Sequence, residues 1–347
     1  MARGKSKFKK PKARVAVAPP AAAPMAPRFD CPSRPAPAAP PLPLRALPSQ
    51  APPFELKEID GKGMGLVASR DLEPGTLVLK EVPIVVWSLE DNPVKLERRV
   101  SALTHEQRAQ YNALAVCTTA EEEERSLAIF KTNSMQLGAG QDNCGVFLQG
   151  SRFNHSCTPN VQRHWDEEQG VEWFILSHQV KKGEELCITY QETRAARVTR
   201  RARLKEAFGF DCNCSTCSFS DLKVLISDTH RTQIKYLDES TSSLQSKPLE
   251  LIKTVNQIIH LLKEEELVTC RTDAAFEAMS ACVWNGDRLN ASRWIDRILD
   301  YEKVEAGVWS TKYRDVEAWK GDPTRHPAWN INSSMMGIPS QVLVGPW

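Results

Sequence analysis

The stretch Arg152-Phe153-Asn154-His155-Ser156-Cys157-Thr158-Pro159-Asn160 sets the organisation of the chain. Asn, His, Ser and Cys occupy consecutive positions, an order that neither the alternation of a strand nor the period of a helix produces. The stretch therefore predicts an irregular loop. If such a loop is buried, its many donors and acceptors need partners, because an unsatisfied buried polar group is costly. A ligand, a metal ion or a second segment of the chain could supply them.

The charge of the chain is unevenly distributed. The 347 residues, enough for about two or three domains, carry a formal net charge of +2. Residues 1–50 contain ten Lys or Arg and one acid, Asp30, so their net charge is +9 and that of the other 297 residues is −7. The basic character therefore belongs to the first segment and not to the body of the protein.

The composition of residues 1–50 predicts a disordered, basic Pro/Ala-rich tail. Twelve prolines and few aromatic residues leave too little apolar surface to offset the entropy of ordering. The polybasic cluster at its start fits a solvated tail, a nuclear-import signal or a nucleic-acid tether. Any contact with nucleic acid is therefore expected through this tail alone.

Targeting and membrane signals are weak. No hydrophobic run approaches the ~18 residues of a membrane span, so no membrane association is expected. Val15 to Ala26 is apolar but interrupted by prolines, which makes a poor signal-peptide core. Without a signal peptide, the ten cysteines predict reduced thiols or metal ligands and not a disulfide framework.

Strand and helix signals alternate along the body of the chain. Gly63-Met64-Gly65, between two short expected strands, fits either a hairpin turn or a backbone that must approach a ligand closely. A helical insertion is expected at about 92–132, with capping boxes at Thr104/Gln107 and Thr119/Glu122. The remaining expected strands are Phe54–Ile59, Leu66–Ser69, two within Thr76–Trp87 bent at Pro83, Val161–Trp165, Val171–Val180 and Leu186–Tyr190. Helices are expected over Thr104–Val116, Thr193–Phe208, Leu249–Leu262 and Ala274–Tyr301.

Three closely spaced thiols, Cys212, Cys214 and Cys217, indicate a metal site. Thiolates so close together repel one another unless a cation shares them, and zinc takes four ligands in a tetrahedron. Cys157 in the central loop is the natural fourth ligand, which would make the site closed and structural. The alternative is a set of unrelated surface thiols.

Four motifs in series resemble the SET-domain protein lysine methyltransferases over about residues 54–219. They are Gly63-Met64-Gly65, Asn154 to Asn160, Gly183-Glu184-Glu185-Leu186 leading to Tyr190, and Cys-x-Cys-x-x-Cys. The helical C-terminal part and Asn133 make the chain most similar to the SET-and-MYND (SMYD) branch. The insertion after Trp87 lacks the Cys/His array of a MYND zinc finger, so partner binding by that finger is not carried over.

The resemblance implies a mainly β SET fold, with small sheets around a pseudoknot and a helical insertion, plus an all-α C-terminal domain. The implied domains are the tail at 1–50, the SET domain at 51–191, a post-SET helix with the zinc-binding Cys cluster at 192–219, and a helical, tetratricopeptide-like region at 220–347. That last region would form one side of the substrate cleft.

The resemblance also assigns roles to residues of this sequence. It places S-adenosyl-L-methionine against Lys62, Gly63, Met64 and Gly65, with Asn133 and Asn154 holding its polar groups, His155 bonding the adenine through its backbone, and Phe210 stacking on that ring. Tyr190 would be catalytic, and Cys157, Cys212, Cys214 and Cys217 would bind structural Zn²⁺. Without the other motifs, the sequence would predict that Tyr190 is a structural tyrosine at the end of a strand, with its ring in the core.

The function implied is an S-adenosylmethionine-dependent protein-lysine N-methyltransferase, nuclear and/or cytoplasmic. Its partner would be a lysine-bearing peptide, a histone tail by default and a non-histone protein as the alternative. Two other classes remain open. One is a catalytically inactive SET-fold module that binds peptides in chromatin or transcription regulation. The other is a zinc-stabilised nucleic-acid-binding protein that uses the basic tail.

Overall fold

The computed structural model describes residues 51–88, 90–117, 124–138 and 143–332. The basic tail expected at 1–50 and the capping box expected at Thr119/Glu122 lie outside these residues. Within the described ranges, the helices include none with the length and apolar character that crossing a membrane requires.

The central sheet joins the two ends of the predicted SET region. Its order is β1 (Phe54–Ile59), β2 (Gly63–Ala68), β10 (Glu185–Ile188) and β7 (Asn154–His155). β1 and β2 form an antiparallel hairpin, whereas β7 runs parallel to β10. The strand expected to begin at Leu66 begins at Gly63, because Gly63 and Gly65 already pair with β1.

Two further three-stranded sheets complete the β part, as the predicted fold class requires. One has the order β3 (Leu77–Glu81), β9 (Val171–Leu176), β8 (Val161–Asp166), and the other has the order β4 (Val85–Trp87), β6 (Cys144–Val146), β5 (Met135–Gln136). The predicted bend at Pro83 separates β3 from β4 and so sends them into different sheets.

The buried loop obtains its hydrogen-bond partners mainly from a second segment of the chain. The side chain of Asn160 donates to the Glu185 carbonyl at 2.9 Å and accepts from the Cys187 amide at 2.8 Å. The Ser156 amide donates to the Ile188 carbonyl at 2.9 Å. These bonds and the β7–β10 pairing place the loop beside the segment that leads to Tyr190.

The helical insertion consists of α1 (Pro93–Ser101), α2 (His105–Asn112) and α3 (Arg125–Asn133). The capping box of Thr104 and Gln107 is confirmed, although the helix ends at Asn112 and not at Val116. Apolar side chains of the insertion, among them Leu96 and Tyr111, form one buried cluster with β4 and β6.

The C-terminal half of the described chain is helical. Its elements are α4 (Arg197–Phe208), α5 (Asp221–Thr241), α6 (Pro248–Glu264), α7 (Arg271–Trp284), α8 (Arg288–Glu305) and α9 (Thr311–Glu317), with short 3-10 turns at Ser242–Leu244 and Pro323–Arg325. α4 begins later than expected and ends, as predicted, at Gly209, whose φ is 75°. The single helix expected over Ala274–Tyr301 is wrong, because Gly286 adopts a φ of 68° and Asp287 caps a new helix.

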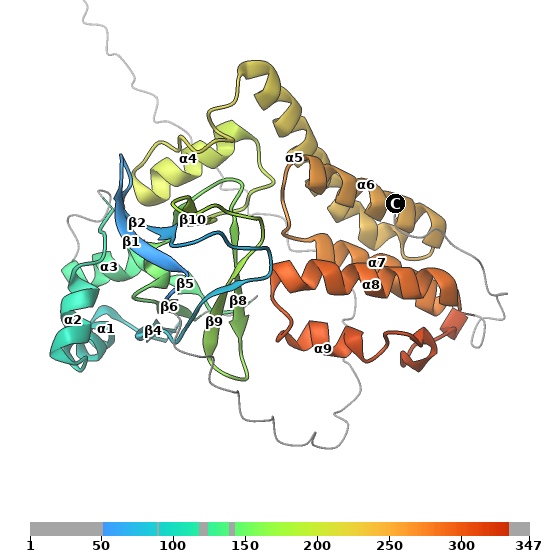
Figure 1. Ribbon diagram of the computed structural model, residues 1–347, viewed down its shortest axis with the longest axis horizontal. Coiled ribbons are helices and arrows are strands. Elements are labelled where there is room, and N and C mark those ends of the chain that lie inside the picture. Colours follow the sequence, from blue (N-terminus) through green and yellow to red (C-terminus); the bar gives the residue numbers. More distant parts are fainter. Residues whose placement is uncertain (1–50, 89, 118–123, 139–142, 333–347) are drawn as a thin grey trace, which may run out of the picture. The chain divides into compact units, whose positions relative to one another are not determined.

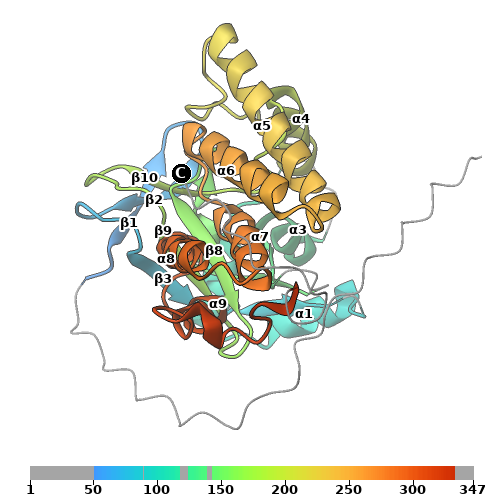
Figure 2. The ribbon, with the colours of Figure 1, turned by 90° about the vertical axis from the view of Figure 1, so that its right-hand side faces the viewer.

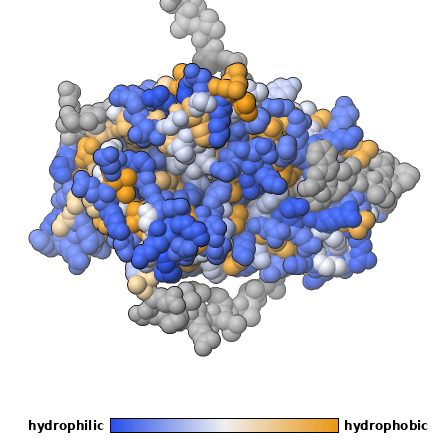
Figure 3. All heavy atoms as spheres, turned by 45° about the horizontal axis from the view of Figure 1, so that its top comes forward, coloured by the Kyte–Doolittle hydropathy of each residue, from blue (hydrophilic) through white to orange (hydrophobic). Residues whose placement is uncertain are grey.

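The helices pack in chain order, α5 on α6, α6 on α7, α7 on α8 and α8 on α9. Figures 1 and 2 show this stack beside the strands, with α8 near β8 and β9. The stack has its own apolar core, in which Trp294 is fully buried. The face drawn in Figure 3 is mostly hydrophilic, with only small hydrophobic patches, as expected when most apolar side chains lie in such cores.

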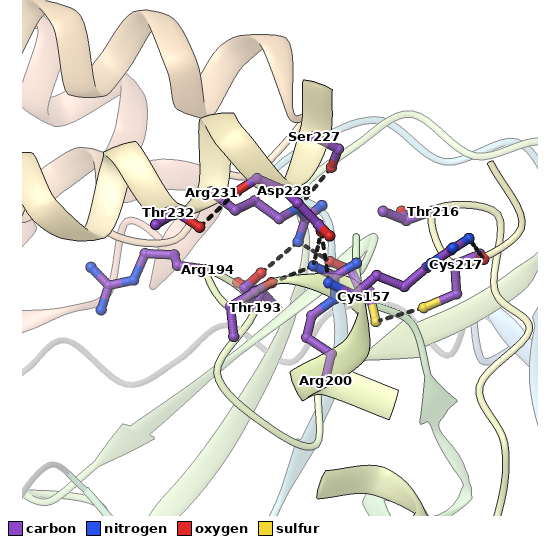
Figure 4. Close-up of polar contacts among 12 residues, drawn as sticks. Cys157, Thr193, Arg194, Arg200, Thr216, Cys217, Ser227, Asp228, Arg231 and Thr232 are labelled. Carbon is purple, nitrogen blue, oxygen red and sulfur yellow. Dashed lines mark hydrogen bonds and ion pairs between the residues drawn. The ribbon is translucent and has the colours of Figure 1, made fainter. Parts of the chain in front are cut away.

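Arg231 on α5 connects the helical stack to the central loop (Figure 4). Its side chain is fully buried, and its Nη1 donates to the carbonyls of Cys157 at 3.0 Å and Thr193 at 2.6 Å. Its Nη2 donates to Thr158 Oγ1 at 3.0 Å, and its Nε donates to Glu265 Oε2 at 2.8 Å. All three guanidinium nitrogens are therefore used, and the charge is paired inside the protein.

Replacing Arg231 by Met should lower the free energy of unfolding by about 3–5 kcal/mol, because it leaves the Glu265 carboxylate buried without its cation. Urea denaturation followed by circular dichroism measures this loss. Lys235→Met on the same helix is the control, since its exposed ion pair with Glu239 at 3.9 Å should contribute less than about 0.5 kcal/mol. Equal stability of the two variants would contradict this role of Arg231.

Candidate active site

A cavity of about 210 Å³ opens between the central loop, the β1–β2 turn and the segment after α4. Its lining joins parts of the chain that are far apart in sequence. The lining residues are Gly61, Lys62, Asn154, His155, Tyr190, Phe210, Asp211, Cys212, Asn213 and Cys214. A second hollow, against α1, contains none of the predicted site residues.

The side chain of Asn154 is oriented by Glu185. Its Nδ2 donates to Glu185 Oε1 at 2.9 Å, while the other carboxylate oxygen accepts from Lys62 Nζ at 2.5 Å. One N–H of the amide is thereby engaged, so Asn154 can offer its carbonyl oxygen and its second N–H to a ligand. Lys62 and Asn154 thus share one carboxylate at the edge of the cavity.

The Gly63-Met64-Gly65 motif lets β2 lie close to the Asn154 side chain, but it does not line the cavity. A Cβ at Gly65 would lie 2.6 Å from Asn154 Nδ2, so only glycine allows β2 to approach this amide. Gly63, Met64 and Gly65 are not among the lining residues, and Met64 is exposed.

Both ring nitrogens of His155 have partners. Nδ1 accepts from the Tyr190 backbone amide at 3.0 Å, and Nε2 lies 3.3 Å from Cys157 Sγ. An accepting Nδ1 places the proton on Nε2, facing the sulfur. Burial lowers the pKa of His155 to about 4, so the ring is neutral at pH 7. A neutral ring with both nitrogens occupied is poorly suited to act as a general base.

Tyr190 is half-buried and lines the cavity. Its hydroxyl donates to the Phe153 carbonyl at 2.7 Å, and its ring lies 5.4 Å from that of His155 and 5.0 Å from that of Phe208. Burial raises the pKa of Tyr190, so the phenol is neutral at pH 7. The hydroxyl is therefore fixed in direction by a backbone carbonyl.

Phe210 and Asn133 differ in their relation to the cavity. Phe210 is half-buried, forms part of its wall and lies 6.3 Å from the His155 ring. Asn133 is not in the lining, and its amide donates to the carbonyls of Ala115 and Ile129, each at 2.7 Å. Its Nδ2 is thus engaged by backbone and is not directed at the other predicted site residues.

Residues that the sequence reasoning missed complete the site. Glu185 stands in the Gly183–Leu186 motif without an assigned role, yet its carboxylate accepts hydrogen bonds from the side chains of Lys62 and Asn154. Gly61, Asp211 and Asn213 also line the cavity. In the sequence, only their closeness to predicted site residues could have indicated these three residues, since each stands within two positions of one.

The four predicted cysteines form one buried cluster. The sulfurs of Cys157, Cys212, Cys214 and Cys217 all lie within 4.8 Å of one another, and those of Cys157 and Cys217 are 3.6 Å apart. A tetrahedral Zn–S distance of about 2.3 Å requires sulfurs about 3.8 Å apart, so this cluster could hold a zinc ion. The neighbouring sulfurs and burial raise the pKa of Cys157, which means that the four cannot all ionise without a cation.

Comparison with known proteins agrees with this geometry. Residues 63–191 match the SET domain family. Histone-lysine N-methyltransferase set5 of Schizosaccharomyces pombe is 28% identical over 277 residues, 79% of this chain and 85% of that protein. A SET and MYND domain-containing protein of Dictyostelium discoideum is 42% identical over 76 residues, 21% of this chain and 14% of that protein. A SET domain-containing protein of the same organism is 36% identical over 92 residues, 26% and 23% of the two chains.

Residues 63–191 therefore form a SET domain, and the chain is similar to SET-domain methyltransferases. Its relatives include a protein named for SET and MYND domains.

The cysteine cluster predicts that the purified protein carries about one zinc ion per chain. Cys212→Ser should lower the bound zinc, measured by mass spectrometry of the metal, to below about a tenth of the wild-type content, because a closed four-thiolate site tolerates the loss of a ligand poorly. Cys144→Ser, in β6 and outside the cluster, is the control and should keep its zinc. Wild-type zinc in the Cys212→Ser protein would exclude this site.

Proposed function

We propose that this protein is an S-adenosyl-L-methionine-dependent protein-lysine N-methyltransferase. The single observation that supports the proposal most is the lining of one cavity by residues from three sequence motifs, with Asn154, Tyr190 and Cys212 as representatives. The match of residues 63–191 to the SET domain family and the similarity to a histone-lysine N-methyltransferase support the same reaction.

The residues of the cavity suit a cofactor with a charged amino acid part and an aromatic base. The carbonyl of Asn154 is available for an ammonium donor, and Lys62 can approach a carboxylate. The exposed side of the Phe210 ring offers a stacking surface for adenine, while His155 presents its backbone. When bound, the cofactor supplies a methyl group activated by a sulfonium. In this proposal Gly65 supports this wall from behind through its close approach to the Asn154 amide, and Asn133 has no contact with the cofactor.

Tyr190 is the proposed catalytic residue, and its task is positioning. Methyl transfer is an in-line displacement that requires the lysine nitrogen, the methyl carbon and the leaving sulfur to be aligned. The fixed phenol hydroxyl can orient the incoming amine. Free lysine has a pKa of about 10.4 and is mostly protonated at pH 7, so an apolar approach and the sulfonium charge must favour the neutral amine.

Zinc is proposed as a structural ion held by Cys157, Cys212, Cys214 and Cys217. Two of these residues, Cys212 and Cys214, also line the cavity. The ion would thereby fix the segment that carries Phe210 against the central loop. The domain limits at 51–191, 192–219 and 220–347, with a tetratricopeptide-like final part, are proposed on the same basis.

The substrate is proposed to be a lysine-bearing peptide, with a histone tail as the first candidate, because a relative is named a histone-lysine methyltransferase. A nuclear and/or cytoplasmic location is proposed with it. The competing proposal is a SET-fold module that binds peptides without catalysis. The two are distinguished by the experiments below.

Calorimetric titration of the full chain with S-adenosyl-L-methionine should show binding at one site, and Asn154→Ala should weaken it by about tenfold or more, as loss of a buried polar partner implies. Asn112→Ala, at the exposed end of α2, is the matched control and should bind like the wild type. If the folded, zinc-loaded wild type binds no cofactor, the enzyme proposal fails and the peptide-binding module takes its place.

Tyr190→Phe should bind the cofactor normally but transfer methyl groups to a histone mixture about a hundredfold more slowly, because only the orienting hydroxyl is removed. Radiolabelled methyl transfer measures the rate. Tyr236→Phe, on the exposed surface of α5, should match the wild type. An unchanged rate in Tyr190→Phe would remove this residue from the mechanism.

A further inference from the structure

One buried side chain, that of Arg231 on α5, contacts two of the segments that line the cavity. Its Nη1 donates to the Cys157 carbonyl at 3.0 Å and to the Thr193 carbonyl at 2.6 Å (Figure 4). Cys157 stands two positions after His155, and Thr193 stands three positions after Tyr190. A single nitrogen atom therefore joins the loop that carries predicted cofactor-binding residues to the segment that carries the predicted catalytic tyrosine.

The same guanidinium is connected to a third segment through two threonine hydroxyls. Its Nη2 donates to Thr158 Oγ1 at 3.0 Å, and this oxygen lies 2.8 Å from Thr216 Oγ1 in a hydrogen bond. Thr216 is buried and stands between Cys214, which lines the cavity, and Cys217. Arg231 is thus bonded, directly or through one hydroxyl, to three of the segments that form the cavity.

The helical stack fixes the guanidinium of Arg231 in place. Its Nε donates to Glu265 Oε2 at 2.8 Å, and the same oxygen accepts from Ser227 Oγ at 2.5 Å. The other carboxylate oxygen, Oε1, lies 3.1 Å from His230 Nδ1. A planar guanidinium held at Nε directs its two remaining nitrogens rigidly, so their contacts with the loop and the Tyr190 segment are fixed as well.

The helical stack does not itself line the cavity. Within the part of the chain that the structure describes, the lining residues all lie between Gly61 and Cys214, before α5 begins. An effect of the stack on the proposed reaction therefore acts through contacts with the surrounding segments, and Arg231 makes such contacts from a fully buried position.

The groups proposed to hold the cofactor are oriented by a different residue. The carboxylate of Glu185 accepts from Lys62 Nζ at 2.5 Å and from Asn154 Nδ2 at 2.9 Å. These bonds lie within the SET core and do not involve Arg231. Loss of the Arg231 contacts should therefore disturb the placement of Tyr190 more than the holding of the cofactor.

We propose that Arg231 is a positioning residue for the methyl-transfer reaction. The inference rests on the proposed function. By joining the Cys157 and Thr193 carbonyls, Arg231 fixes the Tyr190 segment relative to the central loop, and with it the phenol hydroxyl relative to the bound methyl donor. A displacement of about 1 Å is enough to slow such a reaction strongly. Through Glu265 and Arg231, the helical stack then takes part in aligning the reactants.

Single-turnover methyl transfer to a histone mixture at saturating S-adenosyl-L-methionine tests the proposal in Arg231→Lys. A lysine ammonium keeps the positive charge beside Glu265, but one nitrogen cannot replace the fixed fork of three. The rate should fall about 10–100-fold, whereas the calorimetric Kd of the cofactor should stay within about threefold of the wild-type value and the bound zinc should be unchanged.

Ile258→Val is the control, because it loosens the apolar core of the helical stack without changing a contact of Arg231. It should transfer methyl groups at the wild-type rate when both variants are assayed at a temperature at which circular dichroism shows them folded. A loss of rate in Ile258→Val equal to that in Arg231→Lys would mean that the stack acts through stability alone, and would overturn the proposal.

The outcomes separate this inference from the function on which it rests. A folded wild type that transfers no methyl group removes the proposed function and, with it, this inference. An active wild type matched in rate by Arg231→Lys overturns the role of Arg231 alone, as does a loss of rate fully explained by weaker cofactor binding. If Arg231→Lys does not fold, Thr158→Val removes the acceptor of Nη2 and keeps the buried ion pair. That variant should slow transfer about fivefold, and a wild-type rate would overturn the proposal.

Discussion

The structure depends on the connection between the loop Asn154–Asn160 and the segment from Glu185 to Tyr190. Parallel pairing of β7 with β10 and the two side-chain bonds of Asn160 join these segments. One connection satisfies the polar groups of the loop, positions the Tyr190 hydroxyl and places Cys157 where the post-SET cysteines can reach it. The cavity, the position of the Tyr190 phenol and the cysteine cluster therefore all depend on one arrangement of the backbone.

Charge is distributed around this connection in pairs that bridge distant segments. Glu185 holds Lys62 and Asn154, and Glu265 holds Arg231. A buried ion pair stabilises little by itself, but removing one partner leaves a costly charge. Arg231 also donates to the carbonyls of Cys157 and Thr193, so the SET core and the helical stack depend on each other. A metal ion in the cysteine cluster would add to the same network.

Burial and hydrogen bonding give His155 and Tyr190 different roles in the cavity. His155 is neutral and fully occupied, so it contributes shape and backbone, whereas Tyr190 keeps a directed hydroxyl at the cavity. A displacement at an activated methyl group needs alignment more than proton transfer. A site with a fixed phenol and no free base is therefore suited to the proposed chemistry.

The sequence by itself determined several local elements and part of the cavity lining, including Asn154, His155, Tyr190 and Phe210. Capping, turn and alternation signals are local, so the helix that begins after Thr104, the bend at Pro83 and the helix end at Gly209 could be predicted. The four cysteines could be grouped because zinc takes four ligands and three of the thiols are close in sequence. Only the tertiary structure decided the roles of Glu185 and Arg231 and the position of Asn133, because a charge or an amide has no periodic signature. The break at Gly286 was missed because apolar periodicity continues across it, and a positive φ leaves no trace in that pattern.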